Sequence, residues 1–435
     1  MTTLRNTGPS SGVVHNSHNQ TPGSACTKTV FRPRARYIDI ELFAGAGGLA
    51  LGLTAAGLPP HHLYETNRHC TNTLRQNSLG PTPQITGQIH EEDVAHVPWS
   101  RLRQPVRVLS GGPPCQPFSV AGKQRAAKDL RNGFPATLRA VRELRPAIVL
   151  LENVPGLARP SCRPYFNYIT RQLALPAITR RRGESWRDHD RRIHRHMRRP
   201  SFEPDYQVRW WILSAADYGI PQARVRLVIV ASRLDLPAVE SPRPTHSRDA
   251  LMRSQRDGDY WCERGLKPKL RRQWPKRLRG SIVHSAEHLR PWVTVRDAIA
   301  GLPAASISSE DTNNYSLIGA RHYERHSGSE LDWPAKTIKA GVHGIAGGEN
   351  GLLLDNLEHR HFTVNEMARL QSFPDNYRFT GPRSRIIAQI GNAVPVEFAR
   401  VLGETIAPAA FALAAPSHRT ARRTNTTSRL YEALT

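Results

Sequence analysis

Short apolar runs alternate with helix-like runs over the first half of this chain, and that alternation limits the folds open to it. The strand-like runs are residues 37–42, a run ending near Tyr64 and Glu65, and residues 106–110, 147–151 and 225–231. Helical patterns lie at residues 48–56, which Gly57 ends, and at residues 132–144. Strands that alternate with helices in this way predict an α/β fold with a mostly parallel, doubly wound sheet.

Changes in composition indicate where this fold is interrupted. The first 34 residues and residues 416–435 are polar, which predicts two disordered tails. Residues 35–231 form the predicted main domain, and helical patterns at residues 363–373 and 395–413 return to it over residues 362–415. Between them, residues 232–361 are irregular and rich in Pro, Gly, Arg and Trp, which predicts a second, smaller domain.

The charge balance indicates the kind of partner. The chain has 61 Lys and Arg against 36 Asp and Glu, a formal net charge of +25. An excess of this size favours a polyanion, and nucleic acid first. No apolar run approaches the length of a membrane span. The five cysteines, at positions 26, 70, 115, 162 and 262, lack paired spacing, which argues against a disulfide framework or a zinc site and for a reducing compartment such as the cytoplasm.

A cysteine between turn residues is the first candidate for chemistry. Residues 111–119 read Gly-Gly-Pro-Pro-Cys-Gln-Pro-Phe-Ser and follow a strand-like run directly. Pro113, Pro114 and Pro117 fix the backbone around Cys115. A thiol held in this way at a strand end is typical of a nucleophile, although a buried structural cysteine is the simpler alternative.

A glycine loop follows the first strand and is a candidate ligand site. Residues 43–49 read Phe-Ala-Gly-Ala-Gly-Gly-Leu, and no Lys-Ser/Thr follows, so the loop is not a P-loop. Glycines at a strand-to-helix turn let the backbone approach a ligand. Glu65 ends the next strand, where a carboxylate accepts from ribose hydroxyls, and Asp93 could accept from an adenine amino group. NAD and S-adenosylmethionine both suit this arrangement.

Taken together, the glycine loop and the Pro-Pro-Cys-Gln run resemble the first and fourth motifs of the DNA (cytosine-5)-methyltransferase family, of the bacterial restriction-modification type. Further matches follow in the family's order: Glu152-Asn153-Val154, Gln222-Ala223-Arg224-Val225-Arg226, residues 367–374, and Gly391-Asn392-Ala393-Val394-Pro395. The family often has arginine at the position of Asn365, so the resemblance assigns no contact to that side chain. The resemblance covers roughly residues 37–231 and 363–413.

The resemblance implies a Rossmann-like S-adenosylmethionine-dependent methyltransferase sheet, with target recognition in residues 232–361. It implies that Cys115 attacks carbon 6 of cytosine, that Glu152 bonds ring nitrogen 3, and that Arg226, supported by Arg224, holds the base carbonyl. The cofactor-binding residues it implies are Phe43, Gly45, Gly47, Glu65, Asp93, Pro113, Asn392 and Val394. The reaction it implies needs no metal.

We therefore expect methyl transfer to carbon 5 of a cytosine flipped out of a specific duplex DNA sequence. An RNA cytosine methyltransferase is one alternative, although the Cys-Phe-Thr element of the tRNA-modifying branch is missing. A catalytically silent DNA-binding regulatory module is another, and it is disfavoured because Cys115, Glu152 and the arginine pair are all present. We expect a monomer that acts on double-stranded DNA in the cytoplasm, at the nucleoid and not at a membrane. A restriction endonuclease of the same site is a candidate partner.

Residues 180–199 form an insertion in the predicted main domain that holds nine arginines. It has too few apolar residues to fold alone, and a solvated charged loop is the simple interpretation. We expect contact with DNA phosphates instead, because the predicted strands on either side, residues 147–151 and 225–231, are both expected to end at the edge of the sheet that holds the base.

Overall fold

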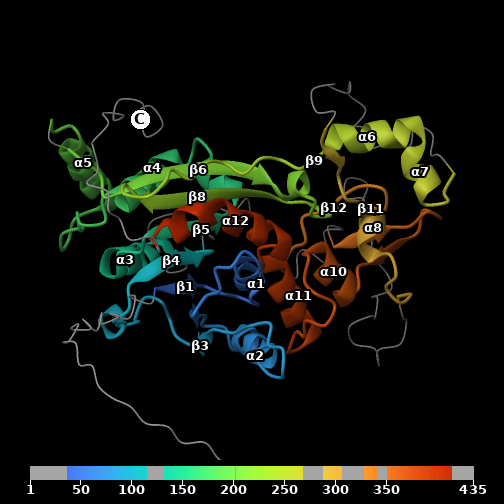
Figure 1. Ribbon diagram of the computed structural model, residues 1–435, viewed down its shortest axis with the longest axis horizontal. Coiled ribbons are helices and arrows are strands. Elements are labelled where there is room, and N and C mark those ends of the chain that lie inside the picture. Colours follow the sequence, from blue (N-terminus) through green and yellow to red (C-terminus); the bar gives the residue numbers. More distant parts are fainter. Residues whose placement is uncertain are drawn as a thin grey trace, which may run out of the picture. The chain divides into compact units, whose positions relative to one another are not determined.

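Seven strands form the main sheet of this computed structural model, in the order β3-β2-β1-β4-β5-β8-β6 (Figure 1). The structure describes residues 37–114, 132–200, 202–267, 288–305, 328–340 and 350–413. The strands are β1 Ile38–Leu42, β2 His62–Tyr64, β3 Gln88–His90, β4 Val106–Gly111, β5 Ile148–Asn153, β6 Tyr206–Ser214 and β8 Val225–Arg233. The first five are parallel to one another, and β8 runs antiparallel between β5 and β6.

This topology confirms the predicted α/β class with a mostly parallel sheet. β6 has no counterpart among the strand-like runs predicted from the sequence, although its second half, Trp210-Trp211-Ile212-Leu213, is apolar. It lies at the edge of the sheet, where a strand has a neighbour on one side only and is partly exposed.

Helices cover both faces of the sheet, as the doubly wound prediction requires. Side chains alternate along β5, so Val149 and Leu151 pack in one core while Ile148 and Leu150 pack in another. The first core contains α3 Phe134–Leu144, α4 Arg163–Ala174 and α5 Trp186–Met197, and the second contains α1 Gly48–Ala55 and α12 Val396–Ala412. A further helix, α2 Arg68–Gln76, follows β2.

Glycine allows α1 and α12 to approach each other closely. A Cβ atom on Gly52 would lie 2.4 Å from the Val396 carbonyl oxygen and 2.4 Å from the Ala399 Cβ. Such distances exclude any larger residue at position 52 without movement of the backbone. This contact brings the start of α12 to the start of α1, next to the glycine loop.

Short elements make up the region that follows β8 (Figure 1). Its strands are β9 His246–Ser247, β10 Arg290–Pro291, β11 Ser329–Glu330, β12 Ala335–Lys336, β13 Gly351–Leu353 and β14 His359–His361. β12 pairs with β7 Gln222–Ala223, which precedes β8. The helices are α6 Arg248–Asp257, α7 Asp259–Glu263, α8 Val295–Ile299, α10 Val364–Leu370 and α11 Arg383–Asn392. Within the described residues, no helix is long and apolar enough to cross a membrane.

Packing continues across the predicted boundary at residue 361. Val295 and Leu352 share one core with Phe362, Met367 and Ile390, so α10 and α11 pack directly on elements of the preceding region. The sequence Thr363-Val364-Asn365-Glu366 predicts a capping box at the start of α10, and the structure confirms it, because Thr363 and Glu366 each accept from the other's backbone N–H. The two predicted tails lie outside the described residues.

Candidate active site

The carboxyl ends of the five parallel strands meet at one edge of the sheet, and the predicted site residues follow them. The glycine loop comes after β1, Glu65 after β2, Asp93 after β3 and Pro113 after β4, while Glu152 lies near the end of β5. In open α/β sheets, ligands bind outside this edge. The structure therefore brings together side chains that are up to 109 positions apart in the sequence, as from Phe43 to Glu152.

The glycine loop has the backbone of a ligand-binding turn. Phe43, Gly45 and Gly47 have positive φ angles of 56°, 55° and 84°. This conformation favours glycine, which occupies two of the three positions. Apart from its chain neighbours, no described residue would lie within 4 Å of a Cβ on Gly45, whereas a Cβ on Gly47 would lie 2.8 Å from the Leu74 side chain. The described part of the chain therefore leaves room for a ligand beside Gly45, and Gly47 is needed for packing.

Glu65 holds this loop in place. Its Oε2 accepts from the Gly45 backbone N–H at 2.8 Å, and its Oε1 accepts from the Asn67 N–H at 2.7 Å. A carboxylate has about four acceptor positions, so two such bonds leave room for ribose hydroxyls. Asp93 is exposed, and its Oδ1 accepts from the Ala95 N–H at 2.8 Å.

Glu41 is a buried acid near the loop that sequence reasoning missed. It is 1% exposed, and among the described residues its Oε2 has no hydrogen-bond partner. Burial, and then the charge of Glu65, raises the pKa of Glu41 well above its usual range, which favours the neutral carboxyl. A charged residue inside the apolar run of β1 was the signal that could have found it. A buried oxygen without a partner fits a site that takes a polar ligand.

The segment after α11 closes the site from the other side. A Cβ on Gly48 would lie 2.3 Å from the Val394 carbonyl oxygen, so this segment touches the start of α1. The Gln371 side-chain amide donates to the carbonyls of Ile390 at 2.5 Å and Ala393 at 3.2 Å. Asn392 is exposed beside them, at the end of α11.

Residues 112–114 lie beside the end of β5. The Asn153 side chain donates to the Pro113 carbonyl at 2.9 Å, and the Gly133 N–H donates to the Pro114 carbonyl at 3.0 Å. Pro114 and Asn132, the described residues on either side of residues 115–131, therefore lie close to each other. Cys115 lies outside the described residues.

Glu152 and Arg226 form a buried ion pair at this point. The Arg226 Nε lies 2.7 Å from the Glu152 Oε1, and both side chains are about one-tenth exposed. Burial lowers the pKa of Arg226, while the neighbouring Glu152 carboxylate opposes that shift. A Cβ on Gly112 would lie 3.7 Å from the Glu152 Oε2. The Glu152 carboxylate and the Arg226 guanidinium therefore lie together next to Gly112, which is three residues before Cys115 in the sequence.

Arg224 differs from its expected role of supporting Arg226 on the base. Its guanidinium donates to the backbone carbonyls of Ile338 at 3.4 Å, Gly391 at 3.1 Å and Ala393 at 2.9 Å. The residue is 2% exposed, and burial lowers its pKa well below the usual range. Its two Nη atoms therefore bond the main chain, while the buried Nε has no hydrogen-bond partner among the described residues.

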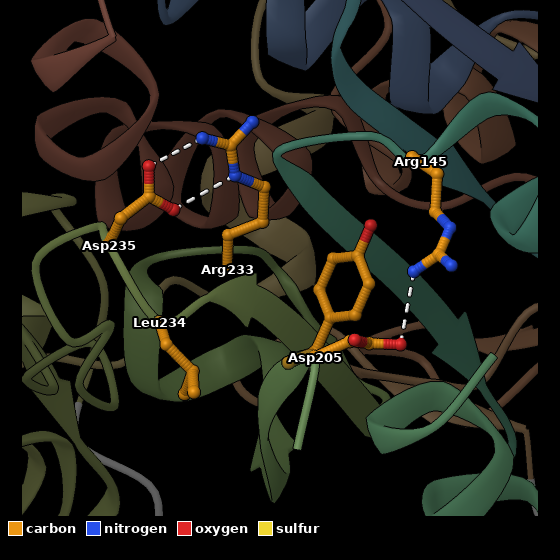
Figure 2. Close-up of a pocket in the computed structure, with 6 residues that line it drawn as sticks. Arg145, Asp205, Arg233, Leu234 and Asp235 are labelled. Carbon is orange, nitrogen blue, oxygen red and sulfur yellow. Dashed lines mark hydrogen bonds and ion pairs between the residues drawn. The ribbon is translucent and has the colours of Figure 1, made fainter. Parts of the chain in front are cut away.

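A shallow pocket of about 430 Å³ lies at the opposite edge of the sheet (Figure 2). The ion pair Arg145–Asp205 and the ion pair Arg233–Asp235 line it. Arg145 precedes β5 and Arg233 ends the antiparallel β8, so this pocket and Glu152 are at opposite ends of the strands. Its arginines are already paired, and it contributes nothing to the site described above.

The family of C-5 cytosine-specific DNA methylases matches this chain over residues 37–175 and 188–407. The chain belongs to this family. The enzyme is therefore a DNA (cytosine-5) methyltransferase, and DNA is its partner. The family match omits residues 176–187, at the start of the arginine-rich insertion.

Relatives and solved structures agree with this assignment. The chain is 32% identical over 381 residues to the Type II methyltransferase M.Eco47II of Escherichia coli, covering 85% of this chain and 78% of that protein. It is 29% identical to M.PspPI of Psychrobacter sp., covering 88% and 82%. Two structures share the fold: the Entamoeba histolytica methyltransferase EhMeth (TM-score 0.53, 14% identity, 88% of this chain and 100% of that one) and the S. pombe Dnmt2 methyltransferase (0.51, 17%, 86% and 99%).

The geometry of Arg224 predicts a stability role that needs no ligand. Arg224→Gln should lower the free energy of unfolding by about 3 kcal/mol or more, because hydrogen bonds from a charged donor contribute about 1.5–3 kcal/mol each. Urea unfolding without DNA or cofactor measures this. Arg209→Gln is the matched control: it removes a partly exposed ion pair with Glu240 on the same sheet, and it should cost less than about 1 kcal/mol. An Arg224→Gln protein as stable as wild type would refute this structural role and favour the expected contact between Arg224 and the base.

Proposed function

We propose that this enzyme transfers a methyl group from S-adenosyl-L-methionine to carbon 5 of a cytosine that is flipped out of a specific duplex DNA sequence, through a covalent adduct with Cys115. The ion pair between Glu152 and Arg226, beside Gly112, is the observation that carries the proposal. The chemistry needs a nucleophile, a hydrogen-bonding carboxyl and a cation around a single base, and the chain reaches Cys115 three residues after Gly112.

Each of these residues has a separate task. The Cys115 thiolate adds to carbon 6 of the base, which breaks the aromatic ring and makes carbon 5 nucleophilic. Glu152 donates a hydrogen bond or its proton to ring nitrogen 3, and Arg226 donates to the base carbonyl oxygen, where negative charge develops. S-adenosylmethionine supplies the electrophilic methyl group for carbon 5 when it is bound. Water then takes the carbon 5 proton, and the electron pair of that C–H bond restores the ring double bond as the Cys115 thiolate leaves. Carbon 6 is shielded inside a duplex, so the base must leave the stack.

The described residues fit the cofactor. Gly45 leaves open space above the loop, the Glu65 carboxylate has unused acceptor positions, and the buried Glu41 oxygen lacks a partner. The residues that would hold the cofactor are Phe43, Gly45, Gly47, Glu65, Asp93, Pro113, Asn392 and Val394. Of these, Gly47 and Val394 would act through the turn and the backbone that shape the site, because their surroundings are already packed.

The covalent mechanism predicts the behaviour of Cys115→Ser. This variant should lose methyl transfer from labelled S-adenosylmethionine to duplex DNA, and should form no covalent complex with 5-fluorocytosine DNA, because a hydroxyl is a far weaker nucleophile than a thiolate. DNA binding should remain. Cys262→Ser, at an exposed cysteine, is the control and should behave as wild type.

Two outcomes would contradict the proposal. Substantial methyl transfer by Cys115→Ser would exclude the covalent step. Transfer by the wild-type enzyme to tRNA and not to duplex DNA would favour an RNA cytosine methyltransferase. Bisulfite sequencing of DNA from cells that express the protein identifies the methylated sequence.

The cofactor assignment predicts weaker binding in Glu65→Ala. The change should weaken S-adenosylmethionine binding by about 1.5–3 kcal/mol for each charge-assisted hydrogen bond that it removes, measured by calorimetry. Thermal unfolding is measured in parallel, because Glu65 also holds the Gly45 N–H. The exposed neighbour Glu92 provides the control Glu92→Ala, which should bind normally. Unchanged affinity in a folded Glu65→Ala protein would remove Glu65 from the site.

We also propose that residues 232–361 choose the DNA sequence, because they lie outside the motifs shared with the family and consist of short, irregular elements. A chimera that carries this segment in a related enzyme should methylate this protein's sequence. Since α10 and α11 share a core with the segment, the graft must keep those contacts. An active chimera with the recipient's specificity would refute the assignment.

Restriction-modification is the proposed setting, because the relatives named above are Type II methyltransferases. We propose that the enzyme acts as a monomer on cytoplasmic, nucleoid DNA and protects it from a restriction endonuclease of the same site. DNA from expressing cells is treated with a restriction endonuclease that cuts the mapped site. If this DNA is cut although the site is completely methylated, the proposed protection against such an endonuclease is refuted.

A further inference from the structure

The arginine-rich insertion folds as a helix with a buried face. Ser185 caps α5, and its Oγ accepts from the Asp188 N–H at 3.2 Å. His189, Ile193 and Met197 recur every four residues and are buried against the core that contains α4. The insertion is therefore more than a solvated loop: three buried positions are enough when an existing helix supplies the other surface.

A buried histidine attaches the preceding segment to this helix. The His189 Nε2 lies 2.9 Å from the Ile178 carbonyl, which can only accept, so Nε2 donates and Nδ1 accepts from the Tyr168 hydroxyl at 2.8 Å. Burial lowers the pKa of His189, in keeping with a neutral ring. Residues 178–189 are thus held against α4.

A short series of contacts connects the insertion to the active-site edge. The Trp186 ring lies 5.3 Å from that of Tyr165, near the start of α4. The Asn132 side chain donates to the Tyr165 hydroxyl at 2.6 Å, and Gly133 bonds Pro114. The expectation that both flanking strands end at this edge is wrong for β8, which is antiparallel to β5 and begins there. The strand that directly follows the insertion is β6, which starts at the opposite edge, so α4 provides the connection instead.

Part of the insertion's charge is neutralised internally. Arg192 pairs with Glu184 at 2.9 Å, and Arg191 pairs with Asp188. The hydrogen bond from Arg192 holds the pKa of Glu184 at about 2. Among the described residues, no carboxylate pairs with the exposed arginines at positions 180, 181, 182, 187, 195, 198 and 199. Four of these, at positions 180, 181, 182 and 187, lie in the segment omitted from the family match.

We propose that Arg180, Arg181 and Arg182 bind backbone phosphates of the DNA duplex that flanks the methylated site. The inference rests on the proposed function, since the duplex must be bound at the active-site edge. Unpaired guanidiniums suit phosphates, which they can bind in a bidentate manner. Duplex DNA carries one charge per about 1.7 Å of its axis, so phosphates follow one another closely along any flank of the site. α4 separates Asn132 from the insertion, and a duplex that runs beyond Asn132 across α4 would bring phosphates to these arginines. These contacts carry no sequence information.

The test compares two triple variants that remove equal charge from different places. Arg180→Gln/Arg181→Gln/Arg182→Gln removes the proposed contacts, and Arg195→Gln/Arg198→Gln/Arg199→Gln removes three exposed arginines from the far end of α5. The first variant should reduce the slope of log affinity against log salt by about 0.9 for each phosphate that it no longer binds. It should weaken all duplex sequences equally and leave the methylated sequence unchanged. The second should keep the wild-type slope.

Duplex length gives a second readout. After bisulfite mapping, duplexes are shortened separately on each side of the site. Wild-type affinity should fall when one particular flank is removed, and the first variant should no longer distinguish the long duplex from the shortened one. Circular dichroism confirms that α5 is intact, since all six arginines are exposed.

Several results would overturn the proposal. A wild-type salt slope in the first variant would show that these arginines are solvated and do not contact phosphates. An equal decrease in slope for both variants would show that the positive charge of the insertion acts as a whole and not through contacts of three particular arginines. Weaker RNA binding with unchanged DNA binding would assign the segment to RNA. A wild-type protein that methylates no DNA would instead refute the proposed function, so the two failures remain distinguishable.

Discussion

The buried guanidinium of Arg224 ties together three parts of the chain that the active site needs. It bonds carbonyls at Ile338, Gly391 and Ala393, and thereby joins the start of β8 to the segment that touches α1. Gln222 and Gln371 extend this network: the Gln222 amide donates to the Gln371 Oε1 at 2.9 Å, and Gln371 donates onward to Ile390. A buried cation without these acceptors would be strongly unfavourable, so the surrounding backbone has one stable arrangement.

Two arginines separated by one residue consequently have different tasks. Arg224 satisfies main-chain carbonyls, whereas Arg226 faces Glu152 at the point where the chain leads to Cys115. The first holds together the backbone segments around the site, and under the proposed mechanism the second would exchange part of its ion pair for a base carbonyl. Breaking a buried pair costs several kcal/mol unless a new partner takes its place, so a correctly placed base would be favoured over an empty or mispositioned one.

Charge is distributed unevenly around this centre. Carboxylates gather at the cofactor loop, where Glu65 fixes Gly45 and its charge helps to keep Glu41 neutral. Unpaired arginines gather on the insertion beside α4. A neutral or cationic ligand is thus favoured at the first place and a polyanion at the second, which suits a sulfonium cofactor and DNA.

Sequence alone determined most strands of the sheet, the glycine loop, the Glu-Asn-Val strand end and the capped helix at Thr363, because each depends on local periodicity or turn chemistry. The resemblance carried by these motifs indicated the family, which the comparisons confirm. Tertiary structure decided the rest. The edge strand β6 is held by its pairing with β8, and Arg224 bonds carbonyls more than 100 positions away. Glu41 is buried within β1, and α5 packs through His189, Ile193 and Met197 next to α4. Each of these outcomes depends on a partner outside the element itself, so the element's own pattern could not specify it.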